Sequence, residues 1–249
     1  MKIFNYLLLI LSFNFLLISC SSTPAPGTSE AEVLYNEIKS NYDGKRYLMA
    51  LEKISTFRTK YPYSFYISEI ELLRADIYFD QQNYLEAVDA YLTFKDFHPK
   101  HKNLDRVEWR IAESFFHQMP ETVDRDLSAA QSGINSYQNL ILKYPSSEYR
   151  EKAKSRIEAM EKLLEDKEAY IANFYFRTND FQSASYRYEK IMNFVKNEEI
   201  LKYSAKNLVE CYVNLKKADK CLDGILNFRK YFEQNTINQL MKKCESIKG

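Results

Sequence analysis

The stretch YLEAVDAYLTFKDFHP, residues 84–99, decides the fold of this chain. Ala87 is small, and the apolar side chains of Tyr91 and Phe94 follow it by four and seven residues. These offsets place all three residues on one face of a helix. The helix is expected to end before Pro99, which has no backbone N–H with which to continue it. The stretch therefore predicts an amphipathic helix whose small residue lets a second helix approach closely.

The same pattern returns along the chain. The small residue, followed after twelve positions by a proline in the first three copies, occurs as Ala50, Ala87, Gly133, Ala184 and Cys221. The residues four positions later are Ile54, Tyr91, Tyr137, Tyr188 and Ile225, and those seven positions later are Phe57, Phe94, Leu140, Ile191 and Phe228. A second column stands twelve positions before the first, except in the third copy, where nine extra residues intervene: Ile38, Ala75, Ala112, Ala172 and Val209. Each copy is thus predicted to be two antiparallel helices, and such pairs must stack because one pair cannot bury its own apolar face.

This pattern resembles the tetratricopeptide repeat. The copies follow one another at intervals of 37, 46, 51 and 37 residues, against about 34 in a typical repeat. The insertion explains the interval of 46. The interval of 51 comes from residues 148–177, a stretch without Gly or Pro that is predicted to be one long helix joining repeats three and four. The resemblance implies an all-α, right-handed α-solenoid of about five helix pairs, with repeats one to three in residues 31–147 and repeats four and five with a terminal helix in residues 148–249.

The N-terminus has the pattern of a secretory signal peptide, with a positive charge at Lys2, a short apolar run and a small residue before the cleavage point. The run is shorter than the roughly 20 residues that span a bilayer. Leu17-Ile18-Ser19-Cys20 resembles the bacterial lipobox, whose cysteine is acylated and becomes the mature N-terminus. We therefore expect residues 1–19 to be removed and Cys20 to carry acyl chains; an uncleaved anchor helix is the alternative.

The next segment is predicted to be a flexible tether. Residues 20–30 are mostly small and include two prolines, so they cannot build a core. Ser21, rather than an aspartate, follows the cysteine, which in lipoproteins of this type implies sorting to the outer membrane. The tether would hold the folded part away from the membrane surface.

The composition excludes some classes of protein. Without Lys2 the mature chain has 34 Lys and Arg residues against 34 Asp and Glu residues, so bulk attraction to nucleic acid is not expected. Five Gly and six Pro residues, with 20 Tyr and 16 Phe residues, fit a helical protein with aromatic packing better than a β-sandwich rich in turns.

Three cysteines follow the lipobox: Cys211, Cys221 and Cys244. A location in the cell envelope would permit disulfides, and the odd number leaves at least one cysteine unpaired or bonded to another molecule. The sequence favours three buried small apolar residues over a bond between Cys221 and either of the other two.

Residues suited to catalysis or metal binding are sparse. His98 and His101 could contact a metal, but no cysteine or carboxylate cluster adjoins them at ligand spacing, and packing explains His98 better because it occupies the column of Tyr61. Asp124-Arg125-Asp126 could offer paired carboxylates, but the interposed arginine favours a salt-bridged loop. A phosphate-binding glycine loop and a nucleophile elbow are absent from the sequence. We therefore expect no enzyme, no metal and no cofactor beyond the covalent acyl chains.

Four stretches resemble the BamD family, the lipoproteins of the β-barrel assembly machine of Gram-negative outer membranes. They are Tyr61-Pro62-Tyr63-Ser64-Phe65-Tyr66, His101-Lys102-Asn103-Leu104-Asp105-Arg106-Val107, Val123-Asp124-Arg125-Asp126 and Tyr144-Pro145-Ser146-Ser147-Glu148-Tyr149. Lys102 replaces a proline of the family pattern. The Asp-Arg loop in the repeat-three insertion is the most specific of the four.

The resemblance implies a scaffold at the periplasmic face of the outer membrane. Its C-terminal repeats would bind a POTRA domain of BamA, its N-terminal repeats would receive unfolded outer-membrane β-barrel proteins, and other Bam lipoproteins are further candidate partners. Arg187 matches an important arginine of repeat four and could form a two-pronged bond with a BamA carboxylate, the alternative being a solvated side chain. Candidates to line a groove for the substrate, unless they pack between repeats, are Tyr61, Pro62, Tyr63, Phe65 and Tyr66.

A different envelope lipoprotein built from the same repeat is the alternative function. Such a protein would scaffold peptidoglycan synthesis or a trans-envelope complex. It would share the anchor and the helix pairs, but not the Asp-Arg insertion.

Overall fold

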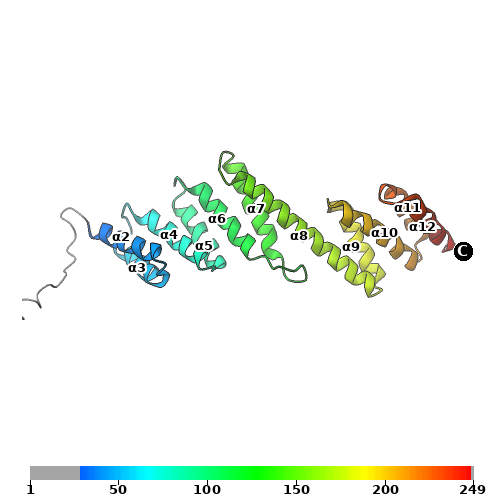
Figure 1. Ribbon diagram of the computed structural model, residues 1–249, viewed down its shortest axis with the longest axis horizontal. Helices are drawn as coiled ribbons and strands as arrows, with labels where there is room; N and C mark the ends of the chain where they lie inside the picture. The colour runs from blue at the N-terminus through cyan, green and yellow to red at the C-terminus, as the bar shows by residue number, and fades with distance from the viewer. Residues whose placement is uncertain (1–28, 248–249) are drawn as a thin grey trace, which may run out of the picture. The chain divides into compact units, whose positions relative to one another are not determined.

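The computed structural model describes residues 29–247, and in this range every regular element is a helix (Figure 1). The predicted all-α class is therefore confirmed, while the predicted signal peptide and Cys20 lie outside the described residues. The helices are α2 (Glu30–Asp43), α3 (Tyr47–Lys60), α4 (Ile67–Asp80), α5 (Tyr84–Phe97), α6 (Leu104–His117), α7 (Ser128–Lys143), α8 (Arg150–Arg177), α9 (Phe181–Phe194), α10 (Glu198–Asn214), α11 (Ala218–Asn227), the 3-10 helix η2 (Arg229–Tyr231) and α12 (Gln234–Ser246).

The predicted columns form the buried faces of successive helices from α2 to α11. All five residues of the small column are buried, and so are all five residues four positions later. In the column seven positions later, four residues are buried and Phe228 is half-buried, because α11 ends at Asn227. The column on the preceding helices, Ile38, Ala75, Ala112, Ala172 and Val209, is 0% exposed throughout. The helix pairs of the tetratricopeptide pattern are thus confirmed by burial at the expected positions.

By its internal contacts the chain divides into two compact units, one ending at Ile77 and the other beginning at Tyr78. The first unit packs α2, α3 and α4 around a core that includes Ile38, Ile54 and Phe57. This division falls within α4 and not at the expected border between residues 147 and 148. Helices in a repeat array contact mainly their neighbours, so the position with the fewest contacts across it can lie at any helix pair. The grouping of the repeats at residue 147 stays a prediction.

Two kinds of turn recur between the helices. Tyr61, His98 and Tyr144, the residues before the three prolines, cap α3, α5 and α7 with φ values of −130°, −125° and −129°. A following proline disfavours the helical region for its predecessor, so the predicted helix ends are confirmed and have this physical cause.

Within four of the five pairs, all but the third, the turn uses a residue in the left-handed region. Four such residues stand five positions before the small column: Lys45, Gln82, Asn179 and Lys216, with φ values of 55°, 63°, 60° and 54°. In one of these turns the Gln82 amide donates to the Phe79 carbonyl and the Asn83 amide to the Tyr78 carbonyl, both at 2.9 Å. Glycine is the usual residue at such helix ends, and its absence explains why sequence analysis missed this recurring turn.

The long helix is confirmed as α8, which has 28 residues. Its first half packs against α6 and α7 through Ala153 and Met160, and its second half belongs to the core of the last helices through Ala169 and Ala172. One helix therefore links two separate clusters of buried residues within the second unit.

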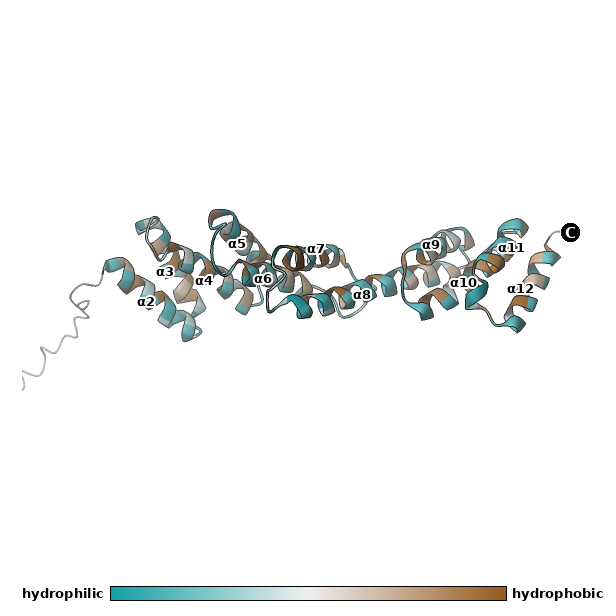
Figure 2. Ribbon diagram, turned by 90° about the horizontal axis from the view of Figure 1, so that it is seen from above, coloured by the Kyte–Doolittle hydropathy of each residue, from teal (hydrophilic) through white to brown (hydrophobic). Residues whose placement is uncertain are grey.

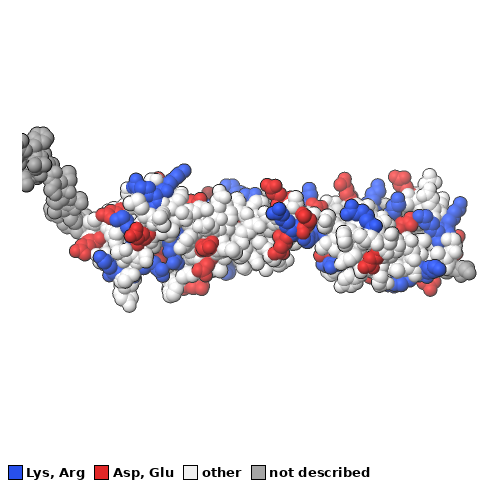
Figure 3. Space-filling view, turned by 90° about the horizontal axis from the view of Figure 1, so that it is seen from below, with Lys and Arg blue, Asp and Glu red and all other residues white. Residues whose placement is uncertain are grey.

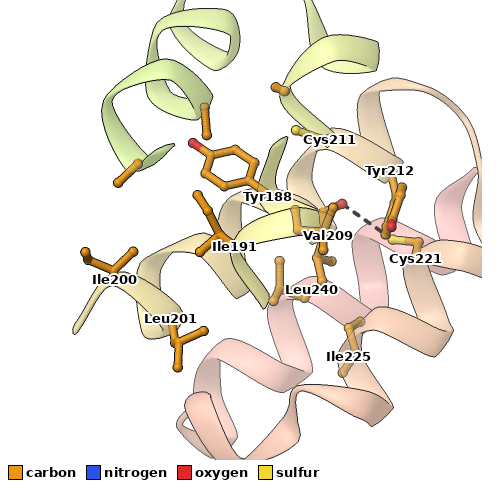
Figure 4. Packing of buried hydrophobic residues seen from close by; sticks show 14 of the residues in the cluster. Tyr188, Ile191, Ile200, Leu201, Val209, Cys211, Tyr212, Cys221, Ile225 and Leu240 are labelled. Atoms are coloured by element: carbon orange, nitrogen blue, oxygen red, sulfur yellow. Dashed lines mark hydrogen bonds between the residues drawn. The ribbon is translucent and has the colours of Figure 1, made fainter. Parts of the chain in front are cut away.

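The expectation of three free cysteines was wrong. Cys221 and Cys244 form a disulfide between α11 and α12, with their Cα atoms 5.7 Å apart, and only Cys211 is a free, buried cysteine among the described residues. Figure 4 shows Cys211, Cys221 and Tyr212 around Val209, whose carbonyl lies 3.9 Å from Cys221 Sγ. In Figure 2, α9 to α12 each carry both hydrophobic and hydrophilic segments, as helices with one buried face do. The sequence could not reveal the bond because α12 continues none of the columns.

Candidate functional site

The loop from Tyr61 to Tyr66 is anchored by two of its aromatic residues. The Tyr61 hydroxyl donates to Glu30 Oε2 at 2.8 Å, and its ring meets Phe57 edge-on with centroids 5.5 Å apart. The hydrogen bond to the Glu30 carboxylate raises the pKa of Tyr61 above its ordinary value. At the other end of the loop, the Tyr66 ring stacks on Tyr35 of α2 at 4.6 Å. Both anchoring rings therefore pack against neighbouring side chains, which favours the packing alternative for them.

The other two aromatic rings of this loop project into solvent. Tyr63 is 99% exposed and Phe65 is 91% exposed, although Phe65 also meets the anchored Tyr66 edge-on. Between them, the Ser64 amide donates to the Tyr61 carbonyl at 3.1 Å, and the Ser64 carbonyl accepts from Ile67 at the start of α4. Fixed backbone hydrogen bonds thus hold two exposed aromatic rings on one protruding loop, and Pro62 fixes the chain direction into it.

Arg187 lies on α9, is partly buried, and already forms an ion pair within the chain, with which a partner's carboxylate would compete. Its Nη1 donates to Glu168 Oε2 on α8 at 3.3 Å, and Lys190 donates to Oε1 of the same carboxylate at 2.6 Å. The Arg187 side chain is 32% exposed. Sequence analysis missed Glu168, because only the packing of α8 against α9 brings it within reach. The carboxylate holds two cations of α9 in one place on the surface.

The Asp-Arg loop is attached to the long helix. Lys167 of α8 donates its ammonium to the Arg125 backbone carbonyl at 2.5 Å. The Asp126 carboxylate accepts from the Ser128 hydroxyl at 2.7 Å and from the Ser128 amide at 3.0 Å, and these hydrogen bonds lower the pKa of Asp126. A hydrogen bond from Thr122 likewise lowers the pKa of Asp124. Hydrogen bonds with Ser128 and Lys167 therefore hold the loop in place. The sequence instead favours salt bridges between Arg125 and the two aspartates beside it.

A buried polar network, which sequence analysis missed, lies where α6, α7 and α8 meet. The carboxylate of Glu113, only 7% exposed, accepts from the Tyr137 hydroxyl at 2.5 Å and from Arg156 Nε at 2.9 Å. Burial, together with this hydrogen bond, raises the pKa of Tyr137 far above its ordinary value. The Arg156 guanidinium also covers the Phe116 ring at 4.0 Å. Every member has a partner within the fold, as buried charges require, so the network fits a structural role.

The histidines singled out in the sequence pack against an aromatic ring. The His98 and His101 rings lie 4.9 Å and 5.0 Å from the Phe94 ring. Across the described residues, no group of three or more His, Cys, Asp or Glu side chains is arranged to hold a metal ion. Over the same range, none of the helices combines the length and the apolar character needed to cross a membrane.

Comparison with known proteins gives consistent matches. The family model described as "YfiO: Outer membrane lipoprotein" matches residues 28–221. A Vibrio cholerae protein named outer membrane protein assembly factor BamD is 25% identical over 215 residues, which cover 82% of this chain and 89% of that protein. A Neisseria gonorrhoeae protein of the same name is 23% identical over 201 residues, covering 77% of this chain and 75% of that one. Among solved structures, the complex of the yeast Sti1 TPR2AB domain with pHSP90 is similar at a TM-score of 0.45 and 13% identity, covering 86% of this chain and 98% of that one.

Proposed function

Because this chain belongs to the YfiO family of outer membrane lipoproteins, we propose that it acts in outer-membrane protein assembly as a non-catalytic scaffold held to the membrane by acyl chains on Cys20. The observation that carries the proposal is the family match over residues 28–221, joined by relatives named outer membrane protein assembly factor BamD. The helix pairs support it, because a stack of such pairs offers side chains for binding along its length.

We further propose that unfolded barrel proteins are received by the first unit through Tyr63 and Phe65. Large exposed aromatic rings supply apolar contact area at a small entropic cost, since each has only two rotatable side-chain bonds. Their loop is held in place by the packed rings of Tyr61 and Tyr66, so little order has to be created on binding. An extended segment with aromatic side chains fits such a surface.

This part of the proposal is tested with the Tyr63→Ala/Phe65→Ala double variant and a synthetic C-terminal strand of a barrel protein. Loss of two aromatic anchors is expected to weaken binding by about 2 kcal/mol, or roughly thirtyfold. Leu48→Ala is the matched control, because Leu48 is 79% exposed on α3 of the same unit. Equal affinities of the double variant and the control would remove these two rings from the substrate site.

On the partner side, we propose that Arg187 contacts a carboxylate of a BamA POTRA domain. Glu168 supports this role by orienting the guanidinium at the surface while leaving the side chain about one-third exposed. A partner carboxylate would compete with, or join, this existing pair, and a planar guanidinium can bind two acceptors at once.

The experiment that decides the function as a whole is purification of the acylated chain from its own envelope in mild detergent, with partners identified by mass spectrometry. A barrel protein with POTRA domains is expected as the main partner. Recovery of peptidoglycan enzymes or Tol-type proteins in its place would contradict the assembly role and favour the other kind of envelope scaffold.

A further inference from the structure

An open cleft of about 490 Å³ lies between α11 and α12. We call it the α11–α12 cleft and define it by its lining residues: Ile225, Leu226, Arg229, Gln234, Ile237, Asn238, Met241 and Lys242. Leu226 is 63% exposed in it, although it is a large apolar side chain. None of these residues belongs to the Tyr61–Tyr66 loop or to the group of Arg187, Lys190 and Glu168.

The charged residues that line the cleft are all positive. Its apolar part consists of the buried Ile225, the exposed Leu226 and half-buried side chains of α12, while its polar part contains two cations, two amides and no carboxylate. Arg229 and Lys242 make no ion pair within residues 29–247, whereas Lys243, the next residue, pairs with Glu210 of α10. The cleft therefore offers hydrogen-bond donors and positive charge around an apolar surface.

The surroundings of the cleft carry the same sign of charge. From Asn214 to Ile247 there are seven Lys and Arg residues against four Asp and Glu residues. On the face that Figure 3 draws, Lys and Arg side chains lie over the C-terminal helices with Asp and Glu side chains among them. Because Arg229 and Lys242 are the charged groups that line the cleft itself, an acidic partner is favoured there.

The disulfide joins the two walls of the cleft. Cys221 lies one helical turn before Ile225 on α11, and Cys244 lies three residues after Met241 on α12. The bond adds a covalent link to the apolar packing of α12, in which Leu240 is buried and Ile237 and Met241 are half-buried. The bond therefore sets the spacing of the walls before any ligand arrives, which lowers the entropic cost of binding.

We propose that the α11–α12 cleft docks an acidic segment of a partner protein that carries a bulky apolar side chain, and that the Cys221–Cys244 bond keeps the cleft in its binding shape. The apolar side chain would cover Leu226 and Ile225, and the acidic groups would pair with Arg229 and Lys242. The two amides favour a peptide, because each amide side chain can donate to and accept from a backbone; Gln234 donates to Asn238 one turn along α12 at 3.1 Å, which places the two amides next to each other.

The first experiment is photo-crosslinking in the native envelope, with benzoylphenylalanine in place of Leu226 in the full chain. The crosslinked peptide is identified by mass spectrometry, and the same probe at Leu142, 78% exposed on α7, is the control. The expected product is an acidic segment of one envelope protein, formed at Leu226 and not at Leu142. Crosslinks to lipid, to a second copy of this chain, or equally from both positions would overturn the proposal.

The second experiment measures the affinity of the identified segment, made as a synthetic peptide, by titration calorimetry. Arg229→Glu/Lys242→Glu is expected to weaken binding at least tenfold, and Lys39→Glu/Lys60→Glu, with the same change in charge on exposed positions of α2 and α3, is expected to leave it unchanged. Equal losses in both double variants would reduce the effect to net charge and refute the docking site.

The disulfide is tested on the wild-type chain, where the cleft residues are intact. Reduction with a phosphine is expected to weaken peptide binding severalfold, with helix content followed by circular dichroism. The Cys244→Ser variant should reproduce the loss without a reductant. Full affinity in both reduced protein and variant would show that the bond does not shape the cleft.

Discussion

Replacing Gly133 by alanine tests how closely the helices cross in the third pair. A Cβ atom built at Gly133 would lie 2.4 Å from Met160 Cε, 3.1 Å from its sulfur and 3.2 Å from Phe115 Cβ. Met160 is 1% exposed, so its side chain has little room to move away. Alanine in a helix gains about 1 kcal/mol over glycine, whereas overpacking a core costs about 1–3 kcal/mol. We therefore expect Gly133→Ala to lower the free energy of unfolding by about 1 kcal/mol, as measured by urea denaturation.

Three further variants separate overpacking from other causes. Met160→Ala alone should cost about 2–5 kcal/mol through the cavity that it leaves, but combined with Gly133→Ala it should cost less than the sum of the two changes, because the new methyl group fills part of that cavity. At Gly224 the nearest atom to an added Cβ is 3.3 Å away, so Gly224→Ala should be the milder change. A Gly133→Ala protein as stable as the wild type, or a double variant with additive losses, would refute the tight crossing.

Three other predictions concern the turn, the partner surface and the anchor. Gln82→Gly should stabilise the protein by about 1 kcal/mol in the same denaturation assay, because it relieves a left-handed residue with φ of 63°, while Asn83→Gly, at φ of −82°, should not stabilise it. Arg187→Glu should weaken BamA binding by about 2 kcal/mol in a titration with the purified POTRA domain. Lys190→Glu, the control, also breaks a pair with Glu168 and should weaken binding less. Equal losses in the two variants would mean that the loss comes from the broken pair with Glu168 and not from a contact of Arg187 with BamA. Cys20→Ala should abolish incorporation of labelled fatty acid and leave the chain out of the outer-membrane fraction, and normal fractionation of this variant would end the lipid-anchor proposal.

The helix pairs could be predicted because their signal is local and repeated. Ala50, Ala87 and Ala184 occupy positions where only a small side chain lets two backbones approach, and each brings apolar residues at helical spacing with it. The proline turns could be predicted for the same reason, since proline acts on its immediate neighbours.

The missed features all depend on contacts between residues far apart in the chain. Glu168 meets Arg187 only through the register of α8 against α9, and Glu113 meets Arg156 across 43 positions. In the Tyr61–Tyr66 loop, the sequence also could not distinguish packed aromatic rings from exposed ones. Tyr63 and Tyr66 are the same residue type and differ only in the side chains that lie beside them. Their exposure depends on the position of α2, which supplies Tyr35 to one ring and nothing to the other.

The disulfide lies where the helix pairs are followed by a single helix. Each helix pair relies on the next one to cover its apolar face, and within residues 29–247 the pair of α10 and α11 is followed by the single α-helix α12. In α12, Leu240 and Cys244 are buried and Ile237 and Met241 are half-buried against the core of the preceding helices. The Cys221–Cys244 bond adds to this packing by removing conformational freedom from the unfolded chain between the two cysteines. The residue of the small column in α11, Cys221, therefore has two roles at once: its side chain is small enough for the helix crossing, and its sulfur bonds to the helix that follows the pair.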